Sequence, residues 1–298
     1  MKVLKEVSVI SNTCIGLGFF DGVHKGHLEL INKLVELSKK TNTNSVIVTF
    51  QKSPAECFYN DVDYITTNSE KEEILNSLGV DYAVELDFDK NMMQMTAKDY
   101  LEKILYSNFK PKYILTGFNH TFGKEKAGNA LFLNKYQEKY NYKYIEIPPV
   151  KTQNDIISSS FIKTLLNKGD IKKANELLGH CFKISGTIIK GNQIGRTIGF
   201  PTANIKYPEI KTKIPFGVYC AEVSLEDKQY KGMLNYGIKP TINNGKNEPV
   251  AEVHIIGFNN DIYGKQIDIS ILNKIRDEKI FNSLDELKKQ IKEDLKRC

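Results

Sequence analysis

The chain has 298 residues, which is enough for one large domain or two ordinary domains with buried cores. Apolar residues make up 41% and charged residues 26%, as in folded globular proteins, so disordered and membrane-embedded classes are excluded. The uncharged run at residues 7–20 is too short for a spanning helix, and no small-residue cleavage site marks it as a signal peptide. We therefore expect a cytoplasmic protein without a membrane partner.

The net charge of +6 arises from 39 lysines and only three arginines against 36 acidic residues. Arginine is the preferred residue for hydrogen bonding to bases and for bidentate binding of phosphates. A chain with only three arginines is therefore not expected to recognise nucleic acid specifically, and its net charge favours the binding of small anions. None of the five cysteines forms a C-x-x-C pair. We expect them to be reduced, with neither a disulfide framework nor a zinc site.

Residues 1–181 alternate between strand-like and helical segments. A helical pattern covers residues 27–40, an S-x-x-E motif at 69–72 predicts a capping box for a helix ending at Gly79, and Thr96 predicts the cap of a helix through residue 107. Such alternation predicts a parallel sheet covered by helices on both faces. The expected strands are residues 14–20, 45–50, 80–88, 112–117 and 142–147.

From residue 182 onward the pattern changes to strand-like segments at short spacing, which predict a small antiparallel barrel. An S-x-x-E motif at 283–286 then predicts the cap of one last amphipathic helix. Residues 182–298 carry +5 of the net charge. We therefore divide the chain into domains of residues 1–181 and 182–298. The expected barrel strands are residues 182–190, 217–225, 229–236, 250–258 and 266–275.

The segment G-F-F-D-G-V-H-K-G-H at residues 18–27 follows the first expected strand and begins the first expected helix. Ligands of open α/β sheets bind at such strand ends, where glycines let the backbone approach a phosphate and the helix N-terminus offers unpaired N–H groups. His24 and His27 can donate to phosphate oxygens there. Alternatively, the glycines only form the turn, and the histidines are surface or metal-binding residues.

Two features of the second domain also indicate phosphate chemistry. The loop at residues 191–205 combines glycines with Thr202 and Asn204, whose oxygens suit a hard cation such as Mg²⁺. Glu252 lies on the polar face of the alternating segment 250–256 and is a candidate general base for a substrate hydroxyl. Alternatively, the loop is an ordinary barrel turn and Glu252 a solvated strand residue.

The first segment resembles the H-x-G-H signature of the nucleotidyltransferase superfamily, and its full form is similar to the G-x-F-D-G-V-H-x-G-H of bacterial bifunctional riboflavin kinase and FAD synthetase. Further segments resemble this family's motifs in the same order along the chain. They are 116–123 with Gly128 (a second glycine-rich loop), 157–163 (I-S-S-T-x-I-R), 191–205 (G-R-x-L-G-F-P-T-A-N), 232–241 (G-M-x-N-I-G-x-x-P-T) and 275–281 (I-R-D-E-x-x-F).

The resemblance implies a Rossmann-like α/β FMN adenylyltransferase domain at 1–181 and a β-barrel riboflavin kinase domain with a C-terminal helix at 182–298. It implies an enzyme that phosphorylates riboflavin to FMN and adenylylates FMN to FAD, releasing pyrophosphate, with ATP as co-substrate and Mg²⁺ as cofactor. The oligomeric state stays open.

The site residues that the resemblance implies fall into five groups. The catalytic residues are Glu252, His27 and His24. The adenylyltransferase site binds ATP and phosphate through Gly18, Phe20, Asp21, Gly26, Ser158, Ser159, Ser160 and Lys163. Its FMN and nucleotide loop contains Asn119, Phe122 and Gly123. The kinase binds ATP and Mg²⁺ through Gly195, Arg196, Thr202 and Asn204, with Thr202 and Asn204 as metal ligands. Its flavin site contains Arg276 and Phe281.

The sequence also departs from the family pattern. Lys163 stands where the pattern has Arg, which replaces a bidentate fork with a point charge, and residues 49–54 lack the His of T-F-x-P-H-P. One alternative is therefore a kinase that has lost adenylyl transfer, and another is a non-catalytic protein that binds flavin or nucleic acid. Residues 158–160 are alternatively a helix N-cap, and Arg276 alternatively pairs with Asp277 or Glu278.

Overall fold

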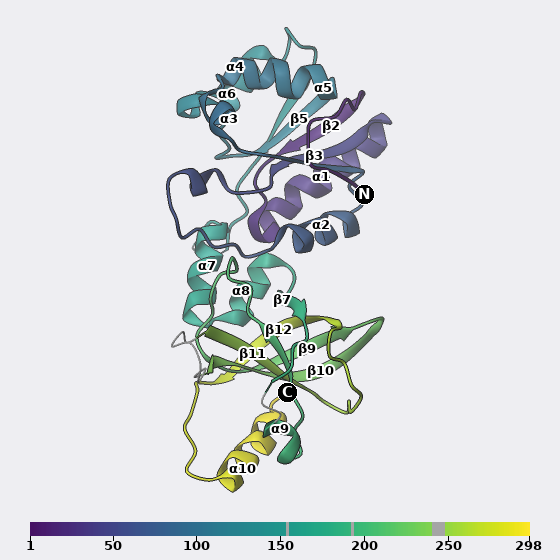
Figure 1. Ribbon diagram of the computed structural model, residues 1–298. Coiled ribbons are helices and arrows are strands. Elements are labelled where there is room, and N and C mark those ends of the chain that lie inside the picture. Colours follow the sequence, from purple (N-terminus) through teal and green to yellow (C-terminus); the bar gives the residue numbers. More distant parts are fainter. Residues whose placement is uncertain (153–154, 192–193, 240–247) are drawn as a thin grey trace. The chain divides into compact units, whose positions relative to one another are not determined.

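The computed structural model describes residues 1–152, 155–191, 194–239 and 248–298. The chain divides into two compact units, Met1–Ser159 and Ser160–Cys298, and each is described by itself (Figure 1). The second unit begins at Ser160, so it contains all of helix α7 (Ser159–Lys168) except its first residue, and the whole of α8 (Ile171–Leu178). The functional division after residue 181 therefore stays a prediction.

The first unit contains a parallel sheet of six strands in the order β1-β4-β3-β2-β5-β6, which confirms the predicted α/β class. Five strands lie where the sequence predicts them, and the short β1 at the N-terminus was not predicted. Its strands are β1 (Lys2–Leu4), β2 (Thr13–Leu17), β3 (Asn44–Phe50), β4 (Tyr82–Leu86), β5 (Pro111–Gly117) and β6 (Lys143–Ile147).

Helices cover both faces of this sheet, as Figure 1 shows. Successive residues of β2 supply opposite cores: Cys14 packs with Leu34 of α1, whereas Ile15 packs with Leu105 and Phe109 of the other layer. Buried side chains of this size contribute roughly 1.5–3 kcal/mol each, so the central strands are held between two apolar layers. One face carries α1 (Lys25–Thr41) and α2 (Asn68–Ser77), and the other α4 (Ala97–Asp99), the π-helix η3 (Tyr100–Tyr106), α5 (Ser107–Phe109) and α6 (Ala130–Tyr136). The remaining short helices are η1 (Asp21–Val23), η2 (Pro54–Cys57), α3 (Lys90–Gln94) and η4 (Lys124–Lys126).

The caps of two helices test the sequence predictions. Thr96 accepts the N–H of Asp99 at 3.0 Å, which confirms its role as a cap. The capping box predicted at 69–72 is wrong, because the box of α2 is formed by Thr67 and Glu70, with bonds of 2.9 and 3.3 Å. A second T-x-x-E pattern two residues upstream competes for the helix start, and it prevails because the backbone of Ile65 is held just before it.

The second unit is an antiparallel six-stranded sheet in the order β7-β12-β9-β10-β11-β8. An isolated bridge between Ile189 and Asn204 nearly closes it into a barrel, which confirms the prediction. The strand β8 was not predicted, because its residues were assigned to the glycine-rich loop. The elements are β7 (Phe182–Thr187), α9 (Ile194–Thr197), β8 (Ala203–Lys206), β9 (Gly217–Leu225), β10 (Lys228–Lys239), β11 (Glu248–Ile255), β12 (Gln266–Arg276) and α10 (Leu284–Leu295).

One prediction about the cysteines is wrong. Cys220 of β9 and Cys298 form a disulfide, whereas Cys14, Cys57 and Cys181 are free thiols. The two bonded residues are 78 positions apart in sequence, and α10 returns the chain to β9 so that their Cα atoms lie 5.2 Å apart. Residue spacing alone does not reveal such a pair, because tertiary structure creates the proximity.

Candidate functional site

The loop at residues 18–24 leaves the carboxyl end of β2, which lies between β3 and β5 in the sheet. The chain passes from β2 through α1 to β3 on one side, and β5 with its following loop lies on the other side. The carboxyl ends of β2 and β5 therefore meet where the strand order reverses, the usual ligand position in open α/β sheets.

The backbone of this loop is shaped by aromatic rings and by residues with positive φ. Phe20 and Gly22 have φ values of 59° and 78°. A Cβ atom at Gly18 would lie 2.9 Å from Cζ of Phe20, and one at Gly26 would lie 3.1 Å from Cε1 of His24. Glycine is needed at 18 because the buried Phe20 ring packs directly on its backbone.

His24 and His27 form a stacked pair at the start of α1. Their ring centroids are 3.6 Å apart, and Nδ1 of His24 accepts the N–H of His27 at 3.4 Å. Burial lowers the pKa of His24 to about 4. Burial, followed by the proximity of His24, also lowers the pKa of His27 well below its usual value. Both imidazoles are therefore neutral near pH 7 and can donate one N–H each.

Asp21 holds the loop in place by accepting three hydrogen bonds. Its Oδ1 accepts the N–H groups of Ile65 at 2.8 Å and Thr66 at 3.3 Å, and its carbonyl accepts the hydroxyl of Ser159 at 2.9 Å. Ser159, which follows Asp21 by 138 residues, thus contacts the loop at residues 18–24. The Asp21 carboxylate is occupied with the 65–66 backbone, so a direct phosphate contact stays a prediction.

Of the other residues expected in this site, Ser158 is half-buried. Ser160, which is exposed, and Lys163, which is half-buried, lie on α7 and are counted with the second unit.

The loop after β5 contains the second set of expected residues. Asn119 is exposed, whereas Phe122 is buried, bridges to Gly128 and packs 5.3 Å from Tyr100 between ring centroids. Gly123 has a φ of 70°, and a Cβ there would meet the backbone nitrogen of Ala97 at 2.6 Å. Phe122 and Gly123 therefore fix the loop to the core. The sequence reasoning missed His120, a histidine beside this turn whose pKa burial lowers to about 4.

The glycine-rich loop at residues 191–205 is described at Gly191 and from residue 194 onward. Asn192 and Gln193 lie outside the described residues, as do Pro240 and Thr241 of the 232–241 segment. In the described part, the N–H of Phe200 donates to the carbonyl of Gly195 at 2.8 Å, which closes a tight turn around Arg196. A Cβ atom at Gly195 would collide with the carbonyl oxygen of Phe200, so only glycine fits at this position. The turn delivers Thr202 to the start of β8.

The register of the barrel aligns several site residues in one row. Glu252 of β11 pairs with Asn204 of β8 on one side and with Asn235 of β10 on the other. Asn235 pairs in turn with Val218 of β9, and Val218 with Arg276 of β12. Directly opposed residues share a face of the sheet, so the row brings together residues from four strands, and Arg276 follows on β12 across an irregularity in the β9–β12 register. Asn235 was not among the expected site residues, although its segment was.

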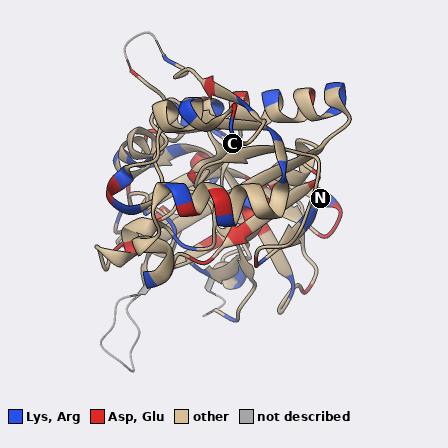
Figure 2. Ribbon diagram, turned by 90° about the horizontal axis from the view of Figure 1, so that it is seen from above, with Lys and Arg blue, Asp and Glu red and all other residues tan. Residues whose placement is uncertain are grey.

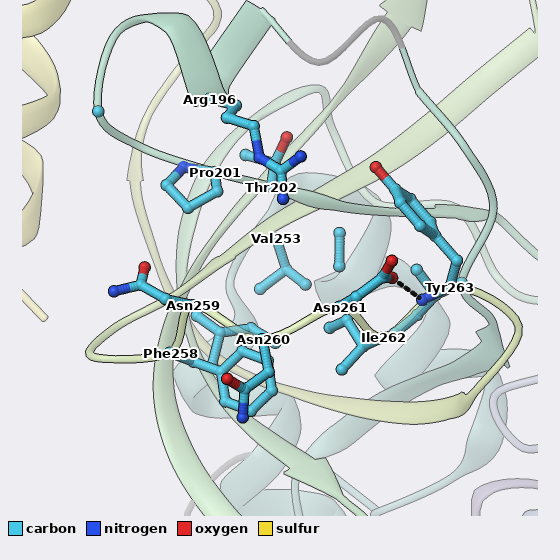
Figure 3. Close-up of a pocket in the computed structure, with 14 residues that line it drawn as sticks. Arg196, Pro201, Thr202, Val253, Phe258, Asn259, Asn260, Asp261, Ile262 and Tyr263 are labelled. Atoms are coloured by element: carbon cyan, nitrogen blue, oxygen red, sulfur yellow. Dashed lines mark hydrogen bonds between the residues drawn. The ribbon is translucent and has the colours of Figure 1, made fainter.

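A cavity of about 370 Å³ lies beside the glycine-rich loop at residues 191–205 (Figure 3). Arg196 and Thr202 reach it from the glycine-rich loop, Val253 forms part of its apolar wall, and Asp261 and Tyr263 also line it. Val253 and Glu252 are successive residues of β11, so their side chains lie on opposite faces. An apolar wall with polar groups at the rim suits a planar base attached to a phosphate chain.

Arg276 has a partner that the sequence reasoning did not consider. Its Nε donates to Oδ2 of Asp294 at 2.8 Å, and its Nη1 donates to the carbonyl of Asp277 at 3.0 Å. The alternative ion pair of Arg276 with the Asp277 or Glu278 carboxylate is replaced in the described residues by the pair with Asp294, and the Asp277 carboxylate pairs with Lys274. The guanidinium also lies 5.6 Å from the ring centroid of Phe281, the other expected flavin residue.

Two general features bear on the class of protein. Among the described residues, basic and acidic side chains are interspersed along the helices rather than gathered by sign (Figure 2). Within the same residues, every helix is too short or too polar to cross a membrane.

The comparisons with known proteins agree with this geometry. Residues 7–161 match the family model for FAD synthetase and residues 178–298 match that for riboflavin kinase. A bifunctional riboflavin kinase/FMN adenylyltransferase from Buchnera aphidicola (subsp. Schizaphis graminum) is 35% identical, over 99% of this chain and 97% of that protein. The protein of the same description from Escherichia coli K12 is 33% identical, over 99% and 96%.

A solved structure from Streptococcus pneumoniae, titled a macrolide-efflux protein, superposes with a TM-score of 0.90. It is 32% identical and covers 99% of this chain and 98% of its own.

A parallel α/β sheet that matches the FAD synthetase model and an antiparallel barrel that matches the riboflavin kinase model together define a transferase with two parts. The matches extend over nearly the full length of the chain and of its relatives. The chain belongs to the bifunctional riboflavin kinase/FMN adenylyltransferase family.

Proposed function

We propose that riboflavin phosphorylation takes place in residues 182–298 and adenylyl transfer in residues 1–181. The chain is a riboflavin kinase and an FMN adenylyltransferase, so it makes FMN and then FAD with ATP. Each family model matches one part of the chain, and each part carries its own glycine-rich motif. Most of α7 and α8 lies between the two matched regions, so their assignment to the first activity is part of the proposal.

In the kinase reaction, Glu252 accepts the proton of the terminal ribityl hydroxyl while the hydroxyl oxygen attacks the γ-phosphorus of ATP and ADP departs. The observation that carries this assignment is the cross-strand row, which sets Glu252 between Asn204 and Asn235. Arg276 and Phe281 bind the flavin at the far end of the same row. The cavity beside Arg196 and Thr202 is proposed for the adenosine end of ATP, and the strand edge at Thr202 and Asn204, next to Glu252, is proposed for its phosphates.

Oxygen ligands from Thr202 and Asn204 fit the preference of Mg²⁺ for hard donors. Asn204 is almost fully buried at the strand edge next to Glu252, so its position is fixed before substrate binds. When bound, Mg²⁺ would neutralise charge on the ATP phosphates.

In the adenylyl reaction, a phosphate oxygen of FMN attacks the α-phosphorus of ATP and pyrophosphate departs. The nucleophile is already an anion, so this step needs orientation and charge stabilisation rather than a protein base. The neutral His24 and His27, together with the N-terminus of α1, supply donors for the developing charge. Ser159, whose hydroxyl donates to the carbonyl of Asp21, completes the proposed phosphate site of the first unit, and the family motif assigns Lys163 to the same reaction.

The proposed substrates are riboflavin, FMN and ATP, in a cytoplasmic enzyme without a specific nucleic-acid partner. The test is turnover of riboflavin with ATP and Mg²⁺, followed by chromatography of the flavins. FMN should appear first and FAD later, and chelation of the metal should stop both. Accumulation of FMN without FAD would instead support a kinase whose adenylyl site is inactive.

A further inference from the structure

Helix α10 presents a carboxylate to the barrel where an apolar side chain would be expected. Its fully buried side chain is Asp294, which has no exposed surface. A buried carboxylate is costly unless it is paired and hydrogen-bonded, so its partners explain why it is tolerated. Both carboxylate oxygens are used: Oδ2 accepts Nε of Arg276 and Oδ1 accepts Nε2 of Gln290, each at 2.8 Å.

These contacts fix the guanidinium of Arg276. Asp294 holds its Nε and the carbonyl of Asp277 holds its Nη1, while Phe281 lies against the group at 5.6 Å. A guanidinium is planar and rigid, so anchoring two of its nitrogens also fixes the third. Among the described residues, none accepts a hydrogen bond from Nη2 of Arg276, which leaves this donor available to a ligand.

The helix that carries Asp294 is itself attached to the same part of the sheet. Cys298, one helical turn beyond Asp294, is bonded to Cys220 of β9, and its carbonyl accepts Nζ of Lys231 at 3.1 Å. Arg276 pairs with Val218, two residues before Cys220 on the same strand. The ion pair and the disulfide therefore connect α10 to neighbouring positions of β9 and β12.

We propose that Asp294 is a positioning residue of the kinase reaction: it orients Arg276 so that Nη2 donates to an oxygen of riboflavin. This inference rests on the proposed role of Arg276 in flavin binding. A positioning role for Asp294 and a purely structural role predict different kinetic effects. A residue that only stabilised the barrel would change the fraction of folded enzyme, and therefore kcat per total protein, but not the KM of the folded enzyme for riboflavin.

The experiment measures KM and kcat for riboflavin in the full-length chain. Asp294→Asn should raise the KM for riboflavin roughly tenfold, the worth of one charge-assisted hydrogen bond, and leave the KM for ATP unchanged. Glu293→Gln is the matched control, because Glu293 is an exposed acid on the same helix that pairs only with Lys296 in the described residues. Its KM should equal that of the wild type. FAD formation from supplied FMN should stay normal in both variants.

A double-mutant cycle separates positioning from direct binding. If Asp294 acts through Arg276, then Asp294→Asn should not raise the KM further in an Arg276→Gln background. The double variant also carries no unpaired buried charge, so it folds even if Asp294→Asn does not. Gln290→Met provides a second test, because it loosens Asp294 without removing its charge, and should raise the KM by a smaller factor.

Three results would overturn the inference. An unchanged riboflavin KM in Asp294→Asn or, where that variant does not fold, in Gln290→Met would refute positioning. Equal increases in the wild-type and Arg276→Gln backgrounds would show that Asp294 does not act through Arg276. A wild-type KM in Arg276→Gln would refute the role of Arg276 as well, and absence of riboflavin turnover in the unmodified chain would refute the proposed function itself.

Discussion

The two loops proposed to bind the phosphates of ATP differ in their chemistry. The first places neutral, stacked imidazoles at a helix N-terminus, whereas the second places hydroxyl, amide and carboxylate oxygens on adjacent strands. The difference follows from the nucleophile. A phosphate monoester attacks as an anion, so the first site needs only donors, but a ribityl hydroxyl must lose its proton, so the second needs a base.

The largest expected effect tests whether the base is confined to the second site. Glu252→Gln removes the proton acceptor and should lower FMN formation about 10²–10⁴-fold, the usual contribution of general-base catalysis. FAD formation from supplied FMN should be normal, because that step uses no protein base. Separate assays with riboflavin and with FMN check this, and a variant that phosphorylates riboflavin at the original rate would remove Glu252 from its role.

The reciprocal variant tests the donors of the first site. His27→Ala should reduce FAD formation about 10²–10³-fold, as expected for loss of a donor to developing charge, and leave riboflavin phosphorylation intact. The measurement is the initial rate of each reaction on the same preparation. Equal losses in both reactions would indicate a general folding defect instead of a site-specific role.

The buried histidine also makes the stability of the chain depend on pH. The pKa of His24 is about 4 in the folded chain, below the value near 6.5 of an exposed imidazole. Between these values the unfolded chain binds a proton that the folded chain does not. Stability is therefore full above about pH 6.5 and declines as the pH falls toward 4, by about 3 kcal/mol from this group.

Urea unfolding followed by circular dichroism between pH 7.5 and 4.5 measures this effect. The His24→Gln variant serves as the control, and its stability should depend less steeply on pH. Identical slopes in the two proteins would show that His24 ionises freely in the folded state.

A smaller effect is expected from the proposed metal ligand of the second site. Thr202→Val replaces an oxygen donor with a methyl group and should raise the KM for Mg²⁺-ATP in the kinase reaction about tenfold. Thr202→Ser keeps the hydroxyl and should be much milder. Similar behaviour of the two variants would mean that the hydroxyl is not a ligand.

The smallest effect concerns the departure from the family pattern in the first site. Lys163→Arg restores a forked donor and should hold or raise FAD formation, by up to about fivefold. Kinase activity should not change. Absence of FAD in both the unmodified chain and the variant would favour a kinase whose first site is inactive.

The sequence by itself determined the alternation of strands and helices, the change to a barrel after residue 181 and most strand positions, because apolar periodicity and turn residues act locally. It also singled out the two candidate phosphate loops, since glycines, histidines and isolated polar residues stand out in short motifs. It misplaced the cap of α2, where two overlapping patterns compete and a tertiary contact of Asp21 decides.

Only the tertiary structure decided which distant residues meet. The hydrogen bond from Ser159 to Asp21 spans 138 residues, and the Cys220–Cys298 disulfide spans 78. Strand register set Asn235 beside Glu252, and the return of α10 paired Arg276 with the Asp294 carboxylate rather than with the carboxylates of its sequence neighbours. Such contacts depend on the packing of whole elements, and no local pattern encodes which side chain will be buried against which partner.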